Sequence, residues 1–81
     1  MASRSALEQN LSDDTRTKIL VNGEATIARV VTLAELLIEL GYSGRKVATA
    51  LNGDFVGEKA RSATRLETGD SVEIVAPRQG G

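Results

Sequence analysis

Eighty-one residues with ten basic and eleven acidic side chains make one small domain of formal net charge −1, which argues against a nucleic-acid-binding protein that relies on a basic face. The chain has neither cysteine nor histidine, so disulfides and thiolate metal sites are excluded and the most common general base is absent. Its only aromatic residues are Tyr42 and Phe55, and no apolar run approaches the roughly 20 residues of a membrane span. We therefore expect a cytoplasmic domain that binds no metal, nucleic acid or membrane and has no autonomous catalytic activity.

The first 16 residues, MASRSALEQNLSDDTR, contain only Leu7 and Leu11 as large aliphatic side chains and show no sustained periodicity. Such a composition buries too little apolar surface to offset the entropy of ordering the chain. We therefore expect residues 1–16 to form a flexible N-terminal arm and the folded domain to span residues 17–76.

A hairpin is predicted at the start of this domain. Residues 18–21 (KILV) and 25–30 (ATIARV) have the apolar character of two strands, and Asn22 and Gly23 lie between them. An Asn-Gly pair in this position favours a type I′ turn, which needs a positive φ at both central residues.

A helix is predicted next by signals at both of its ends. Thr32 is a good N-cap, Glu35 completes a capping box, and Gly41 suits the left-handed position that follows a helix. Four leucines between them have the i, i+3, i+4, i+7 spacing of one apolar stripe: Leu33, Leu36, Leu37 and Leu40. We expect this stripe to be buried against a sheet.

Further strands are predicted in the second half of the chain. Residues 47–53 (VATALNG) form a strand that ends in a second Asn-Gly turn, and Phe55 and Val56 begin a short continuation. Residues 71–76 (SVEIVA) form the last strand. The polar stretch at residues 57–68, with Leu66 as its one large apolar side chain, indicates a loop with room for a short strand or a helical turn.

These elements predict a two-layer α+β domain, because one amphipathic helix buries one face of one mixed sheet. A hairpin crossed by one main helix, with the last strand returning beside the first, is the β-grasp arrangement of four or five strands, although alternation alone does not fix the strand order. The predicted core consists of Ile19, Val21, Leu33, Leu36, Leu37, Leu40, Val47, Leu51, Val72 and Ile74.

The same alternation predicts an apolar patch on the opposite face of the sheet. If Ile19, Leu51 and Ile74 point at the helix, their neighbours in sequence point away from it. These neighbours are Leu20, Ala48, Ala50 and Val75. Contiguous apolar patches often mark partner surfaces, so we expect this face to bind a partner, with incidental surface as the alternative.

The chain ends in Pro77, Arg78, Gln79, Gly80 and Gly81. Proline cannot donate to a sheet ladder, so strand pairing should stop there and residues 77–81 should form a flexible tail. The two glycines make the end thin enough to thread a narrow cleft and present the terminal carboxylate. Arg78 can steer the tail toward an acidic groove, and with Gln79 it completes the predicted partner-binding residues.

Five segments together resemble the ThiS family of sulfur carrier proteins. They are KILVNGE (18–24), TLAELLIELG (32–41), VATALNGDFV (47–56), TRLETGDSVEIV (64–75) and the terminal QGG (79–81). The resemblance covers residues 17–81 in order and spacing, and it implies a ubiquitin-like β-grasp fold and a role in thiamine biosynthesis.

The resemblance also implies that the carboxylate of Gly81, next to Gly80, is the reactive group. In the family an ATP-dependent ThiF-type enzyme adenylates this carboxylate. Sulfur from a persulfide enzyme converts it to a thiocarboxylate, and a ThiG-type thiazole synthase accepts that sulfur. ATP and Mg²⁺ belong to the activating enzyme, so the resemblance makes this chain a co-substrate without a cofactor of its own and not an enzyme.

Three alternatives stay open from the sequence. The small subunit of molybdopterin synthase is another β-grasp carrier that ends in Gly-Gly, and ubiquitin-like modifiers share the same tail chemistry. In a plain interaction module, the patch that contains Leu20 and Val75 would bind a partner while the tail stayed idle.

Overall fold

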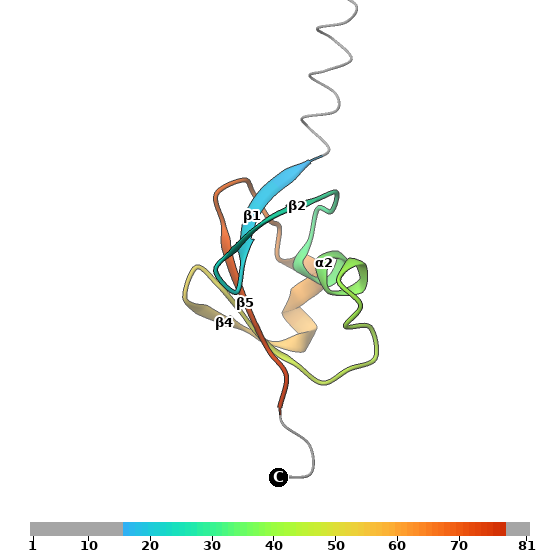
Figure 1. The fold of residues 1–81 in the computed structure, drawn as a ribbon. Helices are drawn as coiled ribbons and strands as arrows, with labels where there is room; N and C mark the ends of the chain where they lie inside the picture. The colour runs from blue at the N-terminus through green and yellow to red at the C-terminus, as the bar shows by residue number, and fades with distance from the viewer. Residues whose placement is uncertain (1–15, 78–81) are drawn as a thin grey trace, which may run out of the picture.

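Five β-strands, an α-helix and a 3₁₀-helix are found in the computed structural model, which describes residues 16–77 (Figure 1). The predicted flexible arm and tail therefore lie, apart from Arg16 and Pro77, outside the described residues. The elements are β1 (Thr17–Val21), β2 (Glu24–Ala28), α2 (Leu33–Glu39), β3 (Ala48–Leu51), β4 (Asp54–Val56), the 3₁₀-helix η1 (Glu58–Ala63) and β5 (Ser71–Val75).

The five strands form one mixed sheet in the order β2-β1-β5-β3-β4. The last strand, β5, lies in the middle, parallel to β1 and antiparallel to β3. The β1–β2 and β3–β4 pairs are antiparallel hairpins. This is the predicted β-grasp arrangement, and it supplies the strand order that the alternation of the sequence left undetermined.

Both Asn-Gly turns have the predicted backbone conformation. The φ angles are 52° at Asn22 and 86° at Gly23 in the first turn, and 51° at Asn52 and 88° at Gly53 in the second. Asparagine and glycine are the residues that tolerate this left-handed region best, which explains why these pairs connect the strands of each hairpin.

Helix α2 begins with the predicted capping box. The backbone N–H of Glu35 donates to Oγ1 of Thr32 at 3.2 Å, and Oε1 of Glu35 accepts from the backbone N–H groups of Val31 at 2.7 Å and Thr32 at 3.2 Å. The two bonds that Glu35 accepts lower the pKa of its carboxyl below the ordinary value, and the bond from Val31 makes the larger contribution. At the other end Gly41 adopts the predicted left-handed conformation, with φ at 90°.

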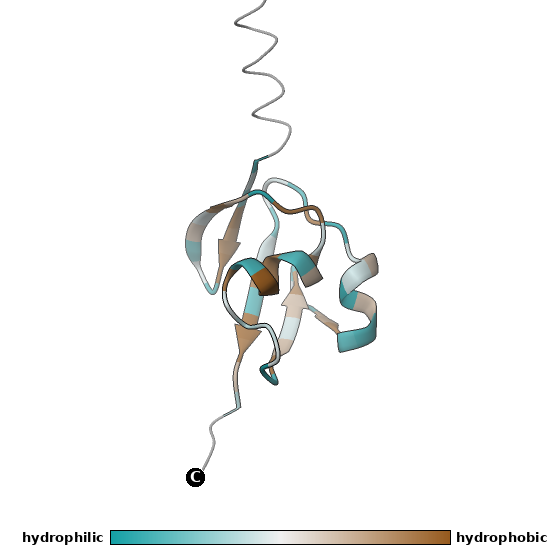
Figure 2. Ribbon diagram, turned by 90° about the vertical axis from the view of Figure 1, so that its right-hand side faces the viewer, coloured by the Kyte–Doolittle hydropathy of each residue, from teal (hydrophilic) through white to brown (hydrophobic). Residues whose placement is uncertain are grey.

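The core lies between α2 and the sheet (Figure 2). Six of the predicted core residues are buried: Ile19, Leu33, Leu36, Leu37, Val72 and Ile74. Val21, Val47 and Leu51 are partly buried against them. The prediction for Leu40 was wrong, because the helix ends at Glu39 and Leu40 occupies the C-cap with 37% of its surface exposed.

Three core residues were not predicted: Ala28, Val56 and Leu66. Leu66 is buried because residues 64–66 run beside the entrance to α2. The Leu33 N–H donates to the Thr64 carbonyl at 2.9 Å, and the Leu66 N–H donates to the Val31 carbonyl at 2.9 Å. The segment expected as a loop thus contains η1, followed by an extended stretch that places Leu66 under the helix.

Candidate functional site: the central strand, the open face and the C-terminal end

Strand β5 positions the C-terminal end of the chain. It is paired on both sides, to β1 through Ser71 and Val72 and to β3 over Val72 to Val75. Ala76 and Pro77 follow without strand structure and are exposed, as the proline predicted. The chain therefore leaves the body from the middle strand of the sheet, at the lower end of the view in Figure 1.

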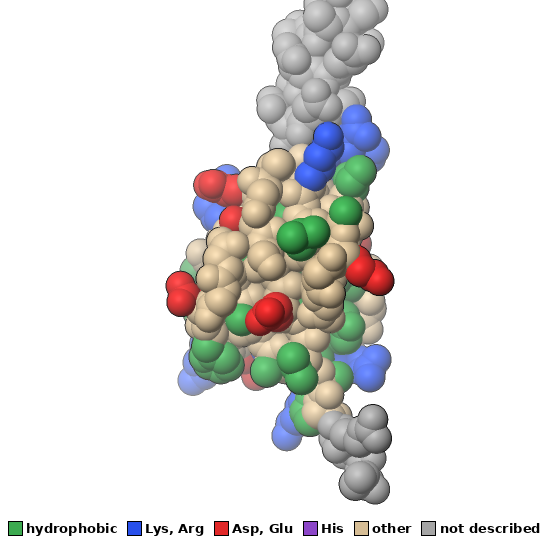
Figure 3. Space-filling view, turned by 60° about the vertical axis from the view of Figure 1, so that its left-hand side comes forward, with side chains coloured by type: hydrophobic (Ala, Val, Ile, Leu, Met, Phe, Trp, Pro, Cys, Tyr) green, Lys and Arg blue, Asp and Glu red, His purple; other side chains and the backbone are tan. Residues whose placement is uncertain are grey.

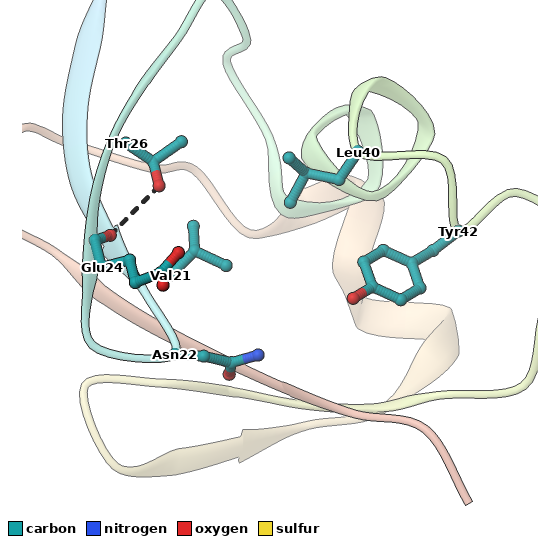
Figure 4. A pocket seen from close by; sticks show the side chains of 6 residues that line it. All are labelled: Val21, Asn22, Glu24, Thr26, Leu40 and Tyr42. Carbon is teal, nitrogen blue, oxygen red and sulfur yellow. Dashed lines mark hydrogen bonds between the residues drawn. The ribbon is translucent and has the colours of Figure 1, made fainter.

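The side chain of Asn22 extends the pairing of β5 beyond the end of β1. Its Oδ1 accepts the Ile74 N–H at 2.8 Å, and its Nδ2 donates to the Ile74 carbonyl at 3.1 Å. The Asn22 backbone N–H also donates to the Val72 carbonyl at 2.8 Å. The carboxamide thus takes the place of the next residue of a neighbouring strand, beside β5 as it runs toward the C-terminus (Figure 4).

Asn52 fixes the opposite end of β5 in a related way. Its Oδ1 accepts the Ser71 N–H at 2.8 Å, and its Nδ2 donates to Oδ1 of Asp70 at 3.1 Å. The sequence identified both asparagines only as turn residues and missed these bonds. The signal for these bonds in the sequence was asparagine at the first turn position. Glycine would adopt the turn conformation equally well, but it has no side chain that could form hydrogen bonds to β5.

The predicted partner-binding residues of the body lie on one face of the sheet, which we call the open face: Leu20, Ala48, Ala50 and Val75. Ala48 lies directly opposite Val75, Ala50 lies opposite Glu73, and Leu20 lies opposite Ser71. Leu20 and Val75 expose 42% and 62% of their surface, Ala48 is exposed, and Ala50 is half-buried. The predicted outward placement is confirmed, and the binding role stays a prediction.

Figure 3 shows this side of the molecule, where hydrophobic side chains lie in separate groups with acidic ones between them. The lower groups lie close to the point where the chain leaves toward its C-terminus. One carboxylate of the open face is Glu73, which lies in β5 between the levels of Ser71 and Val75. The open face therefore offers an apolar contact beside the C-terminal end, interrupted by a negative charge.

Phe55 is a residue of the open face that sequence reasoning did not assign to it. It pairs with Ala50 across β3 and β4, so both side chains point to the same side of the sheet, and it is 76% exposed. A strand of three residues such as β4 is too short for the alternation of apolar and polar residues to show which side chains point to which face. Phe55 places the largest exposed apolar side chain of the described residues at the edge of the open face.

The remaining predicted site residues, Arg78, Gln79, Gly80 and Gly81, lie outside the described residues. Residues 16–77 hold no group of three or more acidic residues placed to bind a metal ion. Neither helical segment in that range has the length and apolar character needed to cross a bilayer. The acid group with a resolved pKa shift in that range is Glu35, whose carboxylate already caps α2.

The sheet order and the central C-terminal strand define a ubiquitin-like β-grasp protein. A solved structure of the same class is the thiamine biosynthesis protein ThiS from Geobacter metallireducens, with a TM-score of 0.68 and 29% sequence identity, over 80% of this chain and 100% of that chain. The model of the ThiS family matches residues 16–81. The chain therefore belongs to the ThiS family, the sulfur carrier proteins of thiamine biosynthesis.

A curated relative adds a second kind of match. The thiazole synthase of Paramagnetospirillum magneticum (strain ATCC 700264 / AMB-1) is 37% identical over 65 residues, which are 79% of this chain and 20% of the relative. The chain thus spans about a fifth of the length of that relative.

Proposed function

We propose that the chain carries sulfur as a thiocarboxylate on Gly81 and donates it for thiazole formation. The observation that carries this proposal is that β5, the middle strand of a ThiS-family fold, runs directly into the segment Pro77-Arg78-Gln79-Gly80-Gly81. Because the last strand is paired on both sides, the folded domain can be bound by a partner and fix the starting point of the short terminal segment. The five residues from Pro77 can extend about 17 Å from the sheet, enough to enter the cleft of another protein.

The chemistry requires activation, because a terminal carboxylate is anionic at neutral pH and a poor electrophile. A carboxylate oxygen of Gly81 attacks the α-phosphorus of ATP and pyrophosphate leaves, which gives an acyl-adenylate. The outer sulfur of a persulfide then attacks the carbonyl carbon and AMP leaves. A thiol finally attacks the inner sulfur, which releases the thiocarboxylate on Gly81 and leaves a disulfide on the partner.

The partners of this proposal follow from that sequence of steps. A ThiF-type enzyme supplies the adenylation and holds ATP and Mg²⁺, and a persulfide-bearing enzyme supplies the sulfur. A cytoplasmic location belongs to the same proposal, because the activation consumes ATP.

We further infer that a thiazole synthase is the acceptor of the sulfur. The support is the relative named thiazole synthase, in which a segment 37% identical to this chain makes up 20% of the protein. In this proposal the open face binds the partner through Leu20, Ala48, Ala50 and Val75, while Arg78 and Gln79 guide the end of the chain. Gly80 and Gly81 then pass through the narrowest part of the partner's cleft.

The experiment that tests the function is a mass measurement on the intact chain. The protein is incubated with ATP, Mg²⁺, a ThiF-type enzyme and a persulfide source, with a variant lacking Gly81 as the control. Exchange of one oxygen for sulfur adds about 16 Da to the full chain and nothing to the control. The activity of the ThiF-type enzyme is first checked on the carrier protein from its own organism. If that enzyme is active and the mass of this chain stays unchanged, the proposal is contradicted and an interaction module with an idle tail is favoured.

A further inference from the structure

A groove of about 660 Å³ lies at the edge of the sheet formed by β3 and β4. The end of α2, residues 42–48, Phe55 of β4 and the helix η1 line it. Its apolar lining includes Leu37, Ile38 and Val47. Ala48 lines the groove and also belongs to the open face, where it pairs with Val75, so the two surfaces are continuous around this edge.

Large apolar side chains at the groove are exposed. Both aromatic residues of the chain, Tyr42 and Phe55, line it. Ile38 exposes 64% of its surface and Phe55 exposes 76%. Aromatic residues and arginine are enriched at protein–protein interfaces, where they anchor a partner, so this concentration of exposed apolar surface indicates a docking surface.

The groove also carries an excess of positive charge, although the whole chain has a formal charge of −1. Arg45, Lys46 and Arg61 line it against one carboxylate, Glu58. Within residues 16–77, Arg45 and Lys46 have no ion-pair partner, and the Arg45 guanidinium lies 5.7 Å from the centre of the Tyr42 ring. Two unpaired cations beside an apolar surface favour a negatively charged occupant.

One wall of the groove is held in place by buried and partly buried hydrogen bonds. Arg61 donates from Nε to Oγ1 of Thr49 at 3.0 Å and from Nη2 to the Val47 carbonyl at 2.7 Å. Thr49 is 2% exposed and donates in turn to the Val56 carbonyl at 2.7 Å. These bonds tie η1 to β3 and β4, so the groove is preformed and a ligand does not have to order this wall.

We propose that this groove binds an acidic amphipathic segment of a partner protein. Apolar side chains of the segment pack against Ile38 and Phe55, and its carboxylates face Arg45 and Lys46. The proposal goes beyond the sulfur-carrier function, because neither Gly81 nor its activation takes part. It adds a second contact surface to the open face.

A peptide fits these features better than a nucleic acid does. A phosphate backbone would use the cations but would leave Ile38 and Phe55 exposed, since it offers no apolar side chains to cover them. Three cationic side chains also make a small footprint for a polyanion. A segment that alternates carboxylates with leucine or phenylalanine satisfies both the charge and the apolar surface.

The test is an NMR titration of the full ¹⁵N-labelled chain with a synthetic amphipathic peptide of about 15 residues, rich in Asp, Glu, Leu and Phe. A matched peptide carries Lys at every acidic position. We expect the acidic peptide to shift the backbone amides of residues 42–48 and 55–62 and to bind at least about tenfold more tightly than the basic one. The difference should shrink as salt is raised, because exposed charges are screened.

Two matched pairs of variants locate the binding. Arg45→Glu with Lys46→Glu should weaken the acidic peptide about tenfold or more, whereas Lys18→Glu with Arg29→Glu, the same charge change outside the groove, should alter it less than about twofold. Ile38→Ser should weaken binding, while Ile27→Ser, an isoleucine of similar exposure on β2, should not. Equal effects within either pair would overturn the proposal.

Three other results would also overturn it. One is that the acidic peptide does not bind. Another is that a single-stranded oligonucleotide shifts the same amides and binds more tightly than the peptide. The third concerns the chain's own acidic residues near its start. A triple variant removes three of these charges: Glu8→Gln, Asp13→Asn and Asp14→Asn. If it shifts the groove amides in the absence of peptide, the occupant of the groove is the segment 1–15 of the chain itself. The Gly81 mass assay is independent of all three, so failure of this proposal leaves the sulfur-carrier proposal standing.

Discussion

Asn22 and Ile74 are 52 residues apart in sequence and exchange two hydrogen bonds, of 2.8 and 3.1 Å, between one side chain and one backbone unit. The turn of the first hairpin thereby holds the strand that leads to the C-terminus. Because β1 ends at Val21, the last part of β5 would otherwise be paired only with β3. The asparagine thus fixes the base of the segment that carries Gly81.

Asn22→Gly tests this relationship, because glycine keeps the positive φ of the turn and removes only the side chain. We expect a loss of about 1 to 3 kcal/mol in the free energy of unfolding, since two hydrogen bonds to a partly buried backbone unit disappear. Hydrogen exchange of the Ile74 amide should accelerate. Asn52→Gly is the matched control, and it should expose the Ser71 amide instead. Unchanged protection of Ile74 in Asn22→Gly would show that the contact contributes nothing.

Val75→Asp tests the role of the open face. Val75 is 62% exposed, so the free energy of unfolding should change by no more than about 1 kcal/mol. Binding of a ThiF-type enzyme, measured by calorimetry, should weaken about tenfold, because a carboxylate would replace an apolar contact beside Glu73. Ile27→Asp is the control, because Ile27 has similar exposure and lies on the same face of the sheet but on β2, two strands away from β5. Equal weakening by both variants would contradict a contact centred on Val75.

Glu35 predicts a pH dependence of stability. Hydrogen bonds from the Val31 and Thr32 N–H groups lower the pKa of its carboxyl from the ordinary 4.5, so its contribution is present above pH 4.5 and is lost as pH falls through the lower folded value. Glu35→Gln does not titrate. The melting temperature of the native chain should exceed that of Glu35→Gln above pH 4.5, and the gap should narrow under acid. A gap that is constant with pH would show that the charge of Glu35 does not matter.

Gly81→Ala tests how closely the end of the chain is enclosed by the activating enzyme. An added methyl group next to the carboxylate should slow acyl-adenylate formation, measured by pyrophosphate exchange, at least about tenfold without changing the melting curve. Lys59→Ala, at an exposed position of η1 outside the open face, is the comparison. Normal exchange by Gly81→Ala would mean that the cleft accepts a side chain at this position.

Local signals in the sequence predicted the parts of the fold that depend on neighbouring residues. Thr32 and Glu35 predicted the start of α2, and the Asn-Gly pairs predicted both hairpins, because capping and turn geometry are set within a few residues. Leu40 was wrongly predicted to be a core residue, because the apolar stripe of leucines continues for one residue beyond the end of α2 at Glu39.

Contacts between distant segments were not predictable in the same way. Leu66 becomes core only when its N–H pairs with Val31, and nothing in the polar stretch around it indicates that neighbour. Phe55 falls on the open face through its register with Ala50, which a strand of three residues does not reveal. The bonds from Asn22 to Ile74 likewise depend on a parallel pairing that joins the two ends of the domain.

The claim that Gly81 is the working group of this protein is tested most directly by locating the added sulfur. After reaction with ATP, Mg²⁺, a ThiF-type enzyme and a persulfide source, the chain is fragmented in the mass spectrometer. We predict a gain of about 16 Da in every fragment that retains Gly81 and in no fragment that lacks it. A gain on any other residue, or none at all with an active enzyme, would contradict the account.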